Sequence, residues 1–389
     1  MTDWQTSKLG GVATLQRGFD LPSRLRRRGG VPIVSSSGTS GWHDQAMVKA
    51  PGVVTGRYGT IGEVFFEGVD FWPLNTTLWV SNFHGNDERF VYYLLQRVNF
   101  KAHSGKSGVP GVNRNDLHTE LVSLPLSIKE QRAIAGALSD CDDLIITLER
   151  QIAKKQAIKQ GMMQQLLTGK TRLPGFTGQW HEVLLGNHVS YVKTVALSRA
   201  QLDVESPVRY LHYGDIHTRN SVTLDAAHEA MPRASSSLLR NAGRLQVGDL
   251  VFADASEDPD GVGKSVEVTS IPDAGVVPGL HTIAARFDKA VLADGFKAYL
   301  QFIPSFRDAL LRLAAGTKVL ATTRSFISSI TLTLPEADEQ RAIASVIADA
   351  DREIVTLRIR LAKARDVKQG MMQQLLTGHA RLPVEEGAA

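Results

Sequence analysis

Apolar side chains recur at alternating three- and four-residue steps in two long segments of the chain. The first stripe runs along Ile134, Leu138, Cys141, Ile145, Leu148, Ile152, Lys155, Lys159, Met162 and Leu166. The second runs along Ile343, Ile347, Ala350, Ile354, Leu357, Leu361, Ala364, Lys368, Met371 and Leu375. This spacing predicts two long helices, each with a coiled-coil seam. At 1.5 Å per residue, the first seam spans about 50 Å.

The two segments are copies of one another. Residues 130–174 and 339–383 lie 209 positions apart, and 27 of their 45 positions are identical. Two copies indicate a duplicated architecture, because a solenoid needs three or more repeats. Each helix can bury its seam against the other, and we expect antiparallel pairing. The chain is therefore predicted to consist of two pseudo-equivalent halves, an arrangement that suits a pseudo-twofold target such as duplex DNA.

Glycine and proline mark where both helices should end. Gly169 and Gly378 follow the last apolar seam positions, and a proline comes five residues later in each copy, which is a helix-stop pattern. Gly161 and Gly370 lie inside the helices, where each should cost about 1 kcal/mol. We expect these two glycines either to allow close backbone approach or to mark a kink.

The segments that precede the helices have a mixed pattern. Short β-branched runs predict strands at Val31–Ser35, Gly52–Thr55, Glu63–Phe66, Thr77–Val80, Val208–Leu211, Asp249–Phe252 and Ser265–Val268. Helices are predicted at Arg89–Val98 and Phe296–Ile303. Trp4 and Leu9-Gly10 are echoed by Trp180 and Leu185-Gly186, 176 positions later. We therefore expect an α+β fold: two mixed domains, 1–127 and 173–335, separated by paired helices, 128–172 and 336–380.

Composition narrows the class of protein. The net charge of +4 and the pI near 9.1 are compatible with DNA binding but do not establish it. No run of 18 apolar residues and no signal peptide is found, so a cytoplasmic protein is expected. One cysteine, Cys141, excludes a disulfide framework and fits a reducing compartment.

Motifs for catalysis are missing. Gly261-Val262-Gly263-Lys264-Ser265 suggests a phosphate-binding loop, but that motif requires glycine where Asp258 stands. The glycine-rich run Gly56–Gly62 lacks dinucleotide-binding spacing. The sequence has no HExxH, paired CxxC or Gly-x-Ser-x-Gly motif. We therefore expect no catalytic residue, no metal site and no cofactor in this chain.

The repeated motifs carry a resemblance to a known family. Glu130-Gln131-Arg132-Ala133-Ile134-Ala135, the run Lys159–Gly169 and Arg172-Leu173-Pro174, with their second copies, resemble the specificity subunits of type I restriction–modification systems. Arg17-Gly18-Phe19-Asp20-Leu21-Pro22 and Gly56-Arg57-Tyr58-Gly59-Thr60-Ile61-Gly62 do so as well. The resemblance covers the whole chain. In the second mixed domain the sequence departs from the family, because residues 254–258 stand where the family has its Gly-Arg-Tyr-Gly loop.

The resemblance implies a non-catalytic DNA-binding subunit. Each mixed domain would be a target-recognition domain that recognises one half of a bipartite, asymmetric site in double-stranded DNA. The helices would set the spacer and dock two adenine-methyltransferase subunits, which bind AdoMet. Translocase–nuclease subunits that use ATP and Mg²⁺ would join this complex, and no membrane would be involved.

Candidate contact residues follow from basic, amide and aromatic side chains beside glycine-rich loops. In the first domain they are Arg24, Arg57, Tyr58, Lys106, Asn113 and Arg114. In the second domain they are His212, Tyr213, Arg219, Lys264, Lys318, Thr323 and Arg324. A solvated basic loop is the alternative interpretation of the run that contains Arg24. For helix pairing and subunit docking we predict Ile134, Leu138, Ile145, Leu148, Ile152, Met162, Leu166, Ile343, Ile347, Ile354, Leu357, Leu361, Met371 and Leu375.

Two other functions remain open at this point. One is a stand-alone coiled-coil protein that binds or shapes DNA, and in the simplest form of that alternative the helices only dimerise the protein. The other is an enzyme with an unrecognised nuclease site. Copurification with a methyltransferase would separate the first from a specificity subunit, and DNA cleavage by the isolated chain with Mg²⁺ would reveal the second.

Overall fold

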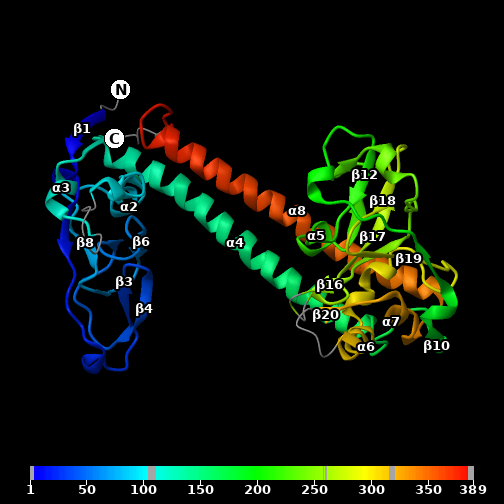
Figure 1. Ribbon diagram of the computed structural model, residues 1–389. Coiled ribbons are helices and arrows are strands. Elements are labelled where there is room, and N and C mark those ends of the chain that lie inside the picture. Colours follow the sequence, from blue (N-terminus) through cyan, green and yellow to red (C-terminus); the bar gives the residue numbers. More distant parts are fainter. Residues whose placement is uncertain (1–3, 104–110, 257, 259–260, 315–319, 384–389) are drawn as a thin grey trace. The chain divides into compact units, whose positions relative to one another are not determined.

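A computed structural model describes residues 4–103, 111–256, 258, 261–314 and 320–383 of the chain. The chain divides into two compact units (Figure 1). Unit 1 contains Met1–Gln151 and Leu357–Ala389, and unit 2 contains Ile152–Thr356. Both units therefore include part of each long helix, α4 (Ile128–Leu166) and α8 (Ala337–Leu375). The expected four-part division of the sequence remains a prediction, since the units cut both helices.

Unit 1 has a four-stranded sheet and a small three-stranded sheet. The larger sheet has the order β2-β8-β5-β6, and the smaller has the order β4-β3-β7. The strands are β1 (Trp4–Lys8), β2 (Thr14–Arg17), β3 (Val31–Ser35), β4 (Gly38–His43), β5 (Gly52–Gly56), β6 (Val64–Glu67), β7 (Trp72–Pro73), β8 (Thr77–Asn82) and β9 (Leu121–Pro125). The helices are α1 (Leu9–Val12), η1 (Ser23–Leu25), α2 (Glu88–Leu95), η2 (Phe100–His103) and α3 (Arg114–His118).

Unit 2 repeats this plan with additions. Its main sheet has the order β11-β19-β15-β17-β13, and its small sheet has the order β14-β12-β18. The strands are β10 (His181–Leu184), β11 (Val189–Val192), β12 (Val208–Leu211), β13 (Thr223–Asp225), β14 (Arg233–Ala234), β15 (Leu250–Ala253), β16 (Ala255–Ser256), β17 (Ser265–Ser270), β18 (Val276–Pro278), β19 (Thr282–Phe287), β20 (Leu320–Ala321) and β21 (Thr331–Leu334). The helices are η3 (Leu185–His188), η4 (Arg199–Gln201), α5 (Tyr213–His217), η5 (Ser236–Leu239), η7 (Lys297–Phe302), α6 (Pro304–Ala314) and α7 (Arg324–Ser328).

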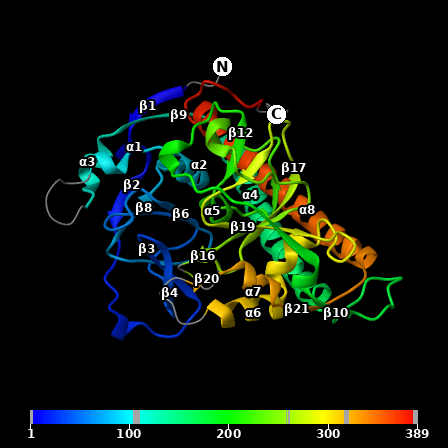
Figure 2. The same ribbon diagram turned by 45° about the vertical axis from the view of Figure 1, so that its right-hand side comes forward.

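Strand pairing shows that the two units share one topology. The small sheets each contain one parallel pair, in which Val34 lies opposite Pro73 in unit 1 and Leu211 opposite Pro278 in unit 2. The first and last strands of each domain also pair, as β1 with β9 and β10 with β21 (Figure 2). Strand β13 has no counterpart in the main sheet of unit 1. The weak sequence echo therefore reflects a duplicated fold.

The long helices contribute to the hydrophobic core of each unit. In unit 1, Ile134 and Leu138 of α4 and Leu375 of α8 join the core around Phe90 and Leu94. In unit 2, Ile343 and Ile347 of α8 join Leu166 of α4. Each fully buried Leu or Ile contributes about 1.5–3 kcal/mol, so the helix ends are anchored by the domains that they flank.

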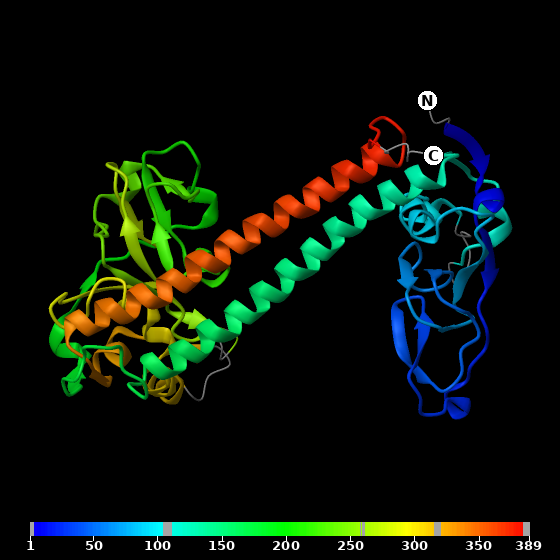
Figure 3. The same cartoon turned by 180° about the vertical axis from the view of Figure 1, so that it is seen from behind.

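The helices are antiparallel within each unit (Figures 1 and 3). In unit 1, Asp142 pairs with Lys368 at 2.6 Å, while Glu149, farther along α4, pairs with Arg365, which lies earlier in α8. In unit 2 the ion pairs Lys155–Glu353 and Lys159–Asp351 run in the same opposed sense. The predicted α+β class, the duplication and the antiparallel pairing are confirmed.

The repeated Glu-Gln pair joins each helix to its domain. Gln131 and Gln340 are about 1 % exposed, and each amide both accepts from a backbone N–H of its domain and donates to a carbonyl just before its own helix. Glu339 accepts two hydrogen bonds from Arg172 of the other helix copy, at 2.5 and 2.6 Å. In unit 1, Glu130 accepts from the Trp4 indole at 3.1 Å. Buried polar groups must be satisfied, so these residue types suit those positions.

The glycines of the repeat divide into two kinds. Gly169 and Gly378, with φ of 69° and 74°, end the helices in the left-handed conformation, as the stop pattern predicted. Gly161 and Gly370 are different, because a Cβ added at either one would meet no atom within 4 Å. The expectation that these two glycines allow close backbone approach is therefore wrong.

The seven predicted strands match observed strands to within two residues at each end. The segment predicted at Arg89–Val98 is α2, and the one at Phe296–Ile303 is the 3-10 helix η7. Helix α6 and the short helices α3, α5 and α7 were not predicted. In the parts of the chain that the structure describes, no helix is long and apolar enough to cross a membrane.

Candidate nucleic-acid interface

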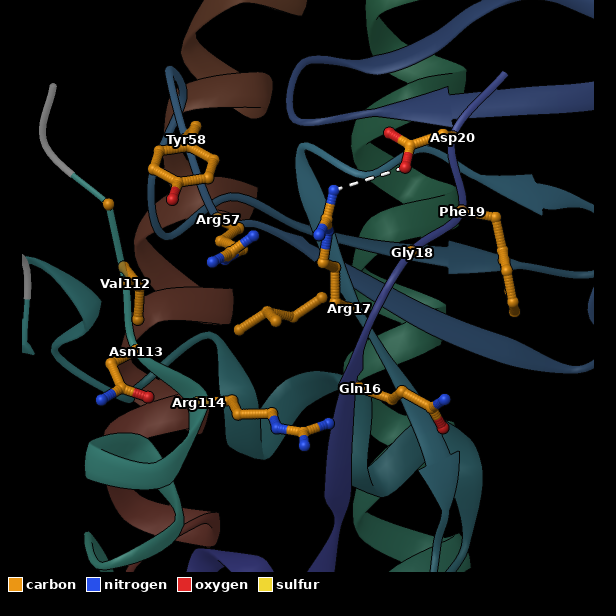
Figure 4. A pocket seen from close by; sticks show the side chains of 12 residues that line it. Gln16, Arg17, Gly18, Phe19, Asp20, Arg57, Tyr58, Val112, Asn113 and Arg114 are labelled. Atoms are coloured by element: carbon orange, nitrogen blue, oxygen red, sulfur yellow. Dashed lines mark hydrogen bonds and ion pairs between the residues drawn. The ribbon is translucent and has the colours of Figure 1, made fainter.

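Unit 1 contains a hollow of about 600 Å³, which we call the Arg57 hollow (Figure 4). It forms between β2 and its continuation, the loop after β5, and the start of α3. Its lining residues are Gln16, Arg17, Gly18, Phe19, Asp20, Arg57, Tyr58, Leu78, Gly111, Val112, Asn113 and Arg114. Four of the predicted contact residues, Arg57, Tyr58, Asn113 and Arg114, are therefore brought together.

Backbone hydrogen bonds hold the loop that carries Arg57. The N–H groups of Arg57 and Tyr58 both donate to the Thr76 carbonyl, at 2.9 and 3.2 Å, and the Val112 N–H donates to the Arg57 carbonyl at 3.0 Å. Tyr58 also forms a β-bridge with Gly111, where any Cβ would lie only 2.1 Å from the tyrosine ring. Glycine is thus required beside Tyr58, and the position of the Arg57 side chain is set by the sheet rather than by a free loop.

The hollow is electropositive. The Arg57 guanidinium lies 4.6 Å from the centre of the Tyr58 ring, a cation–π contact that orients it. Arg17 pairs with Asp20 at 3.5 Å, and both side chains are more than half exposed. Within the described residues, neither Arg57 nor Arg114 has a carboxylate partner. Two guanidinium groups therefore remain available for external acceptors such as phosphate oxygens or the guanine edge.

Helix α3 places Arg114 at its first position. Asn113 caps the helix by accepting from the Asn115 N–H at 3.0 Å, which leaves its amide NH₂ free to donate. At the other end, His118 Nε2 accepts from the Leu15 N–H at 2.9 Å. Burial, and then the nearby Arg114 charge, lower the pKa of His118. A neutral His118 thus ties α3 to β2 beneath the hollow.

Two other predicted residues of the first domain are not part of the hollow. Arg24 is exposed in η1 and does not line it. Lys106 lies outside the described residues. Gln16, Arg17, Phe19 and Asp20 were missed as site residues, although the Arg-Gly-Phe-Asp motif that contains three of them was noted in the sequence.

Unit 2 has Asp254 where unit 1 has Arg57. The Thr322 N–H donates to the Asp254 carbonyl at 2.6 Å, and the Asp254 N–H donates to the His281 carbonyl at 3.1 Å. These bonds repeat those of Arg57 with Val112 and Thr76. Asp254 therefore places a carboxylate at the backbone position where Arg57 places a cation. This exchange is the departure from the family's Gly-Arg-Tyr-Gly loop that the sequence shows.

His281, which lies beside Asp254, belongs to a group of histidine and tyrosine rings that we call the His281 cluster (His212, Tyr213, His217 and His281). The Tyr213 ring lies 4.5 Å from His212, 5.4 Å from His281 and 6.0 Å from His217. His281 Nδ1 is 3.2 Å from the Asp254 carboxylate, and the Lys264 ammonium donates to the His217 carbonyl. Three predicted residues, His212, Tyr213 and Lys264, thus lie together.

His212 has a structural role within this cluster. Its side chain is buried and caps α5 by accepting from the Gly214 N–H at 3.2 Å. Burial, and then the charge of Arg199, lower the pKa of His212, so its neutral form is favoured. Tyr213, which is half-buried, is better placed than His212 to contact a ligand.

The other predicted residues of the second domain are dispersed. Arg219 is 14 % exposed and pairs with Glu229, so its guanidinium is already engaged. Thr323 caps α7 by accepting from the Phe326 N–H, and Arg324 is the first residue of that helix, 5.5 Å from the Tyr191 ring. The Thr323-Arg324 pair repeats Asn113-Arg114 of α3. Lys318 lies outside the described residues.

The predicted seam residues pair the helices. Ten of the fourteen are buried, and the four others, Ile145, Met162, Leu361 and Met371, are half-buried. The stripe packs against the partner helix and the domain cores. The subunit-docking part of that prediction remains a prediction. Exposed apolar residues instead occupy non-seam positions: Leu144, Ile146, Ile158, Val355, Ile359 and Val367.

Among the residues that the structure describes, no group of three or more His, Cys, Asp or Glu side chains could hold a metal ion. Neither the Arg57 hollow nor the His281 cluster contains an arrangement of nucleophile and base. Both are arrangements of donors and acceptors suited to binding.

Known proteins with similar sequences share one description. Residues 1–160 match the model of the type I restriction modification DNA specificity domain. The MjaVIII type I restriction enzyme specificity subunit of Methanocaldococcus jannaschii is 24 % identical over 319 residues, 76 % of this chain and 71 % of that protein. The putative MjaX specificity subunit of the same organism is also 24 % identical, over 79 % of this chain and 72 % of that protein.

Solved structures share the fold. The S subunit of a type I restriction–modification system from M. genitalium has a TM-score of 0.65 at 15 % identity, with 96 % of both chains covered. A chain from a study of complex assembly and conformational transition of the type I R-M system has a TM-score of 0.56 at 14 % identity, covering 97 % of this chain and 98 % of that one. The sequence motifs, the duplicated fold and these matches agree in their similarity to the specificity subunits of type I restriction–modification systems.

Proposed function

We propose that this chain is a specificity subunit and that each unit recognises one half of a bipartite, asymmetric site in double-stranded DNA. The observation that carries the proposal is the replacement of Arg57 by Asp254 at one position of a shared backbone frame. Two modules with the same fold and opposite charge at the same place are suited to different half-sites. Recognition of one palindromic site would instead favour matching side chains.

The Arg57 hollow supplies donors for its half-site. Arg is the most common side chain to bind guanine O6 and N7 in a bidentate manner, and Arg also binds phosphate. Arg57 is held by its cation–π contact with Tyr58, so little side-chain freedom is lost on binding. The free NH₂ of Asn113, beside Arg114, adds a donor for a base edge or a phosphate.

The His281 cluster supplies a different chemistry. The Asp254 carboxylate, 3.2 Å from His281 Nδ1, can accept from the amino group of cytosine, and the Lys264 ammonium, which donates to the His217 carbonyl, adds a cation to this cluster. Tyr213 presents a partly exposed ring among them. We infer that unit 2 recognises a half-site richer in donor groups than the half-site of unit 1.

The two helices act as spacer and as the docking surface for two adenine-methyltransferase subunits. Each helix has 39 residues, about 58 Å at 1.5 Å per residue, which is ample for half-sites one turn of duplex apart, about 34–36 Å. Docking uses exposed residues rather than the seam. Ile146 and Ile158 recur as Val355 and Val367, 209 positions later and between 43 and 53 % exposed, so each helix carries the same pair of exposed apolar positions.

In the assembled complex the methyltransferases bind AdoMet, and translocase–nuclease subunits use ATP and Mg²⁺. This chain contributes the DNA contacts and the geometry, in the cytoplasm. The alternative, a stand-alone DNA-binding or architectural protein, leaves the paired exposed positions on the two helices without a role.

Coexpression with an adenine methyltransferase from the same type I system tests the proposal. The complex should copurify, and adenine methylation mapped across the host genome should reveal one bipartite motif with a fixed gap. Ile146→Asp combined with Val355→Asp should abolish copurification, whereas Gln156→Asp, at an exposed polar position, should not. Tight sequence-specific binding by the chain alone, with no methyltransferase recovered, would favour the stand-alone alternative.

A further inference from the structure

A hydrogen-bonded charge cluster lies where the helices meet the domain of unit 1. The hydroxyl of Tyr93, a buried side chain of α2, donates to Asp142 Oδ2 at 2.7 Å. The other oxygen of Asp142 pairs with the Lys368 ammonium at 2.6 Å. Lys368 also lies 5.5 Å from the centre of the Tyr93 ring. Burial, and then the Asp142 carboxylate, raise the pKa of Tyr93, so the hydroxyl keeps its proton and remains a donor.

Unit 2 contains the same cluster. Tyr299 lies 3.5 Å from Asp351 Oδ2, and Asp351 Oδ1 pairs with the Lys159 ammonium at 2.5 Å. Asp351 and Asp142 occupy equivalent positions in the two 45-residue copies, which lie 209 positions apart, and so do Lys368 and Lys159. Burial and then Asp351 raise the pKa of Tyr299 as well. The same arrangement thus forms in both units, although the two domains that supply the tyrosines share a fold and little sequence.

Each cluster joins three different parts of the chain. The tyrosine comes from a recognition domain, the aspartate from the helix that follows that domain, and the lysine from the other long helix. Both lysines occupy seam positions, where apolar side chains prevail, and they are only 18 and 20 % exposed. A polar residue at such a position specifies register at some cost in stability.

The ion pairs distinguish the observed register from its nearest alternatives. A slip of one heptad preserves the apolar seam, so packing of the stripe alone discriminates weakly against it. In one direction the slip would place Lys368 near Glu149 but Lys159 near Arg358, and in the other it would place the lysines near Ala135 and Ala344. Of these three registers, only the observed one gives both lysines a carboxylate.

We propose that the clusters Tyr93–Asp142–Lys368 and Tyr299–Asp351–Lys159 are positioning residues that determine the spacer length of the DNA site. Apolar packing is not directional, whereas charge-assisted hydrogen bonds fix distance and angle. Each cluster sets the register of the helix pair and the orientation of one recognition domain on it. The inference rests on the proposed recognition of a bipartite site.

The test replaces each cluster by apolar residues in the complex with its methyltransferase. One variant carries Asp142→Leu and Lys368→Met, a second carries Asp351→Leu and Lys159→Met, and a third carries all four. Buried ion pairs can often be replaced in this way without loss of stability, so the complexes should assemble. Methylation at sites whose gap differs from the native gap by about three base pairs, the roughly 10.5 Å of a one-heptad slip, should rise about tenfold or more, as expected when a hydrogen bond to a charged group is lost.

Three further variants make the result decisive. The swap of Asp142→Lys with Lys368→Asp should restore the native gap, which a merely structural role of these side chains would not predict. Glu149→Ala with Arg365→Ala removes an exposed ion pair of the same helices and should leave the gap unchanged. If the apolar variants do not assemble, Tyr93→Phe combined with Tyr299→Phe, which deletes only the two hydroxyl groups, should still broaden the gap.

Different results would overturn the proposed function and the positioning role of the clusters. If the wild-type complex methylates no bipartite motif, the proposed function is wrong. If the wild-type complex methylates a bipartite motif with one gap, and the apolar and tyrosine variants keep that gap unchanged, the function stands and the positioning role is overturned.

Discussion

The two units keep the same backbone bonds but differ in the side chains that those bonds position. Arg57 and Asp254 make equivalent hydrogen bonds through their backbones, yet one is a cation above a tyrosine ring and the other is an anion beside a histidine. Likewise His118 and Ser328 occupy equivalent places, where one binds the Leu15 N–H and the other the Tyr191 hydroxyl. A frame held by main-chain bonds tolerates exchange of the side chains that face a ligand.

The helices show the opposite behaviour. An Asp–Lys pair joins the two helices in each unit, and in each unit a buried glutamine donates to a proline carbonyl just before its helix. Under the proposed function, assembly depends on contacts that the two copies share, while recognition depends on contacts in which they differ.

Lengthening both helices should have the largest effect. Seven residues inserted after Gln151 and after Arg360 keep the heptad phase and leave the ion pairs of each unit intact. The helices lengthen by about 10.5 Å, roughly three base pairs, and three base pairs turn the second half-site by about a third of a turn. Methylation of the original motif should be lost, as measured by methylome sequencing.

Methylation recovered at the same two half-sites with a longer gap would support the helices as spacer. A lengthened complex that assembles and still modifies the original motif at the original gap would show that the domains or the partner subunits set the spacing.

Breaking the Arg172–Glu339 pair should destabilise unit 2. Arg172→Met leaves Glu339, which is 3 % exposed, buried without its cation, at a cost of about 3 kcal/mol. Trp4→Phe, which removes only the indole bond to Glu130 in unit 1, should cost about 1 kcal/mol. Amide hydrogen exchange can assign each loss to its unit. Equal losses in both units would contradict the local origin of these effects.

Substitutions at the equivalent positions Arg57 and Asp254 should alter different halves of the DNA site. Arg57→Ala should weaken binding by about 1–3 kcal/mol and relax one base position if the guanidinium contacts a base, or weaken all sequences evenly if it contacts phosphate. Asp254→Ala should affect only the other half. Arg24→Ala, outside the hollow, serves as the control, and binding by the assembled complex is the measurement. No change for Arg57→Ala would remove this residue from the interface.

Acid should weaken unit 1 through His118. Burial and Arg114 lower the pKa of His118, so the folded state binds fewer protons than the unfolded state, in which the pKa is about 6.5. Stability is therefore lost as the pH falls below about 6.5. His118→Gln retains an acceptor and should flatten this dependence in urea unfolding followed by exchange of β2 amides. An unchanged slope would exclude His118 as the cause.

The sequence predicted the helices and the strands because their patterns are local. The seam spacing predicted two helices that pair, and the β-branched runs predicted strands such as β3 and β12. The Arg57 hollow was predicted only in part, since Arg17 joins it through a pairing of β2 with β8 that no local pattern reveals. The seam spacing also includes Lys159 and Lys368, but only the tertiary structure shows Asp351 and Asp142 beside them. The engagement of Arg219 by Glu229 likewise depends on tertiary structure.

The central claim is that the two units recognise DNA independently within one assembly frame. Replacing residues 175–334, from the end of the first helix repeat to the last strand of the second domain, with those of a related specificity subunit tests it most directly. Methylome sequencing should then show one half of the motif changed, with the other half and the gap retained. A motif altered in both halves, or in its gap, would contradict the account.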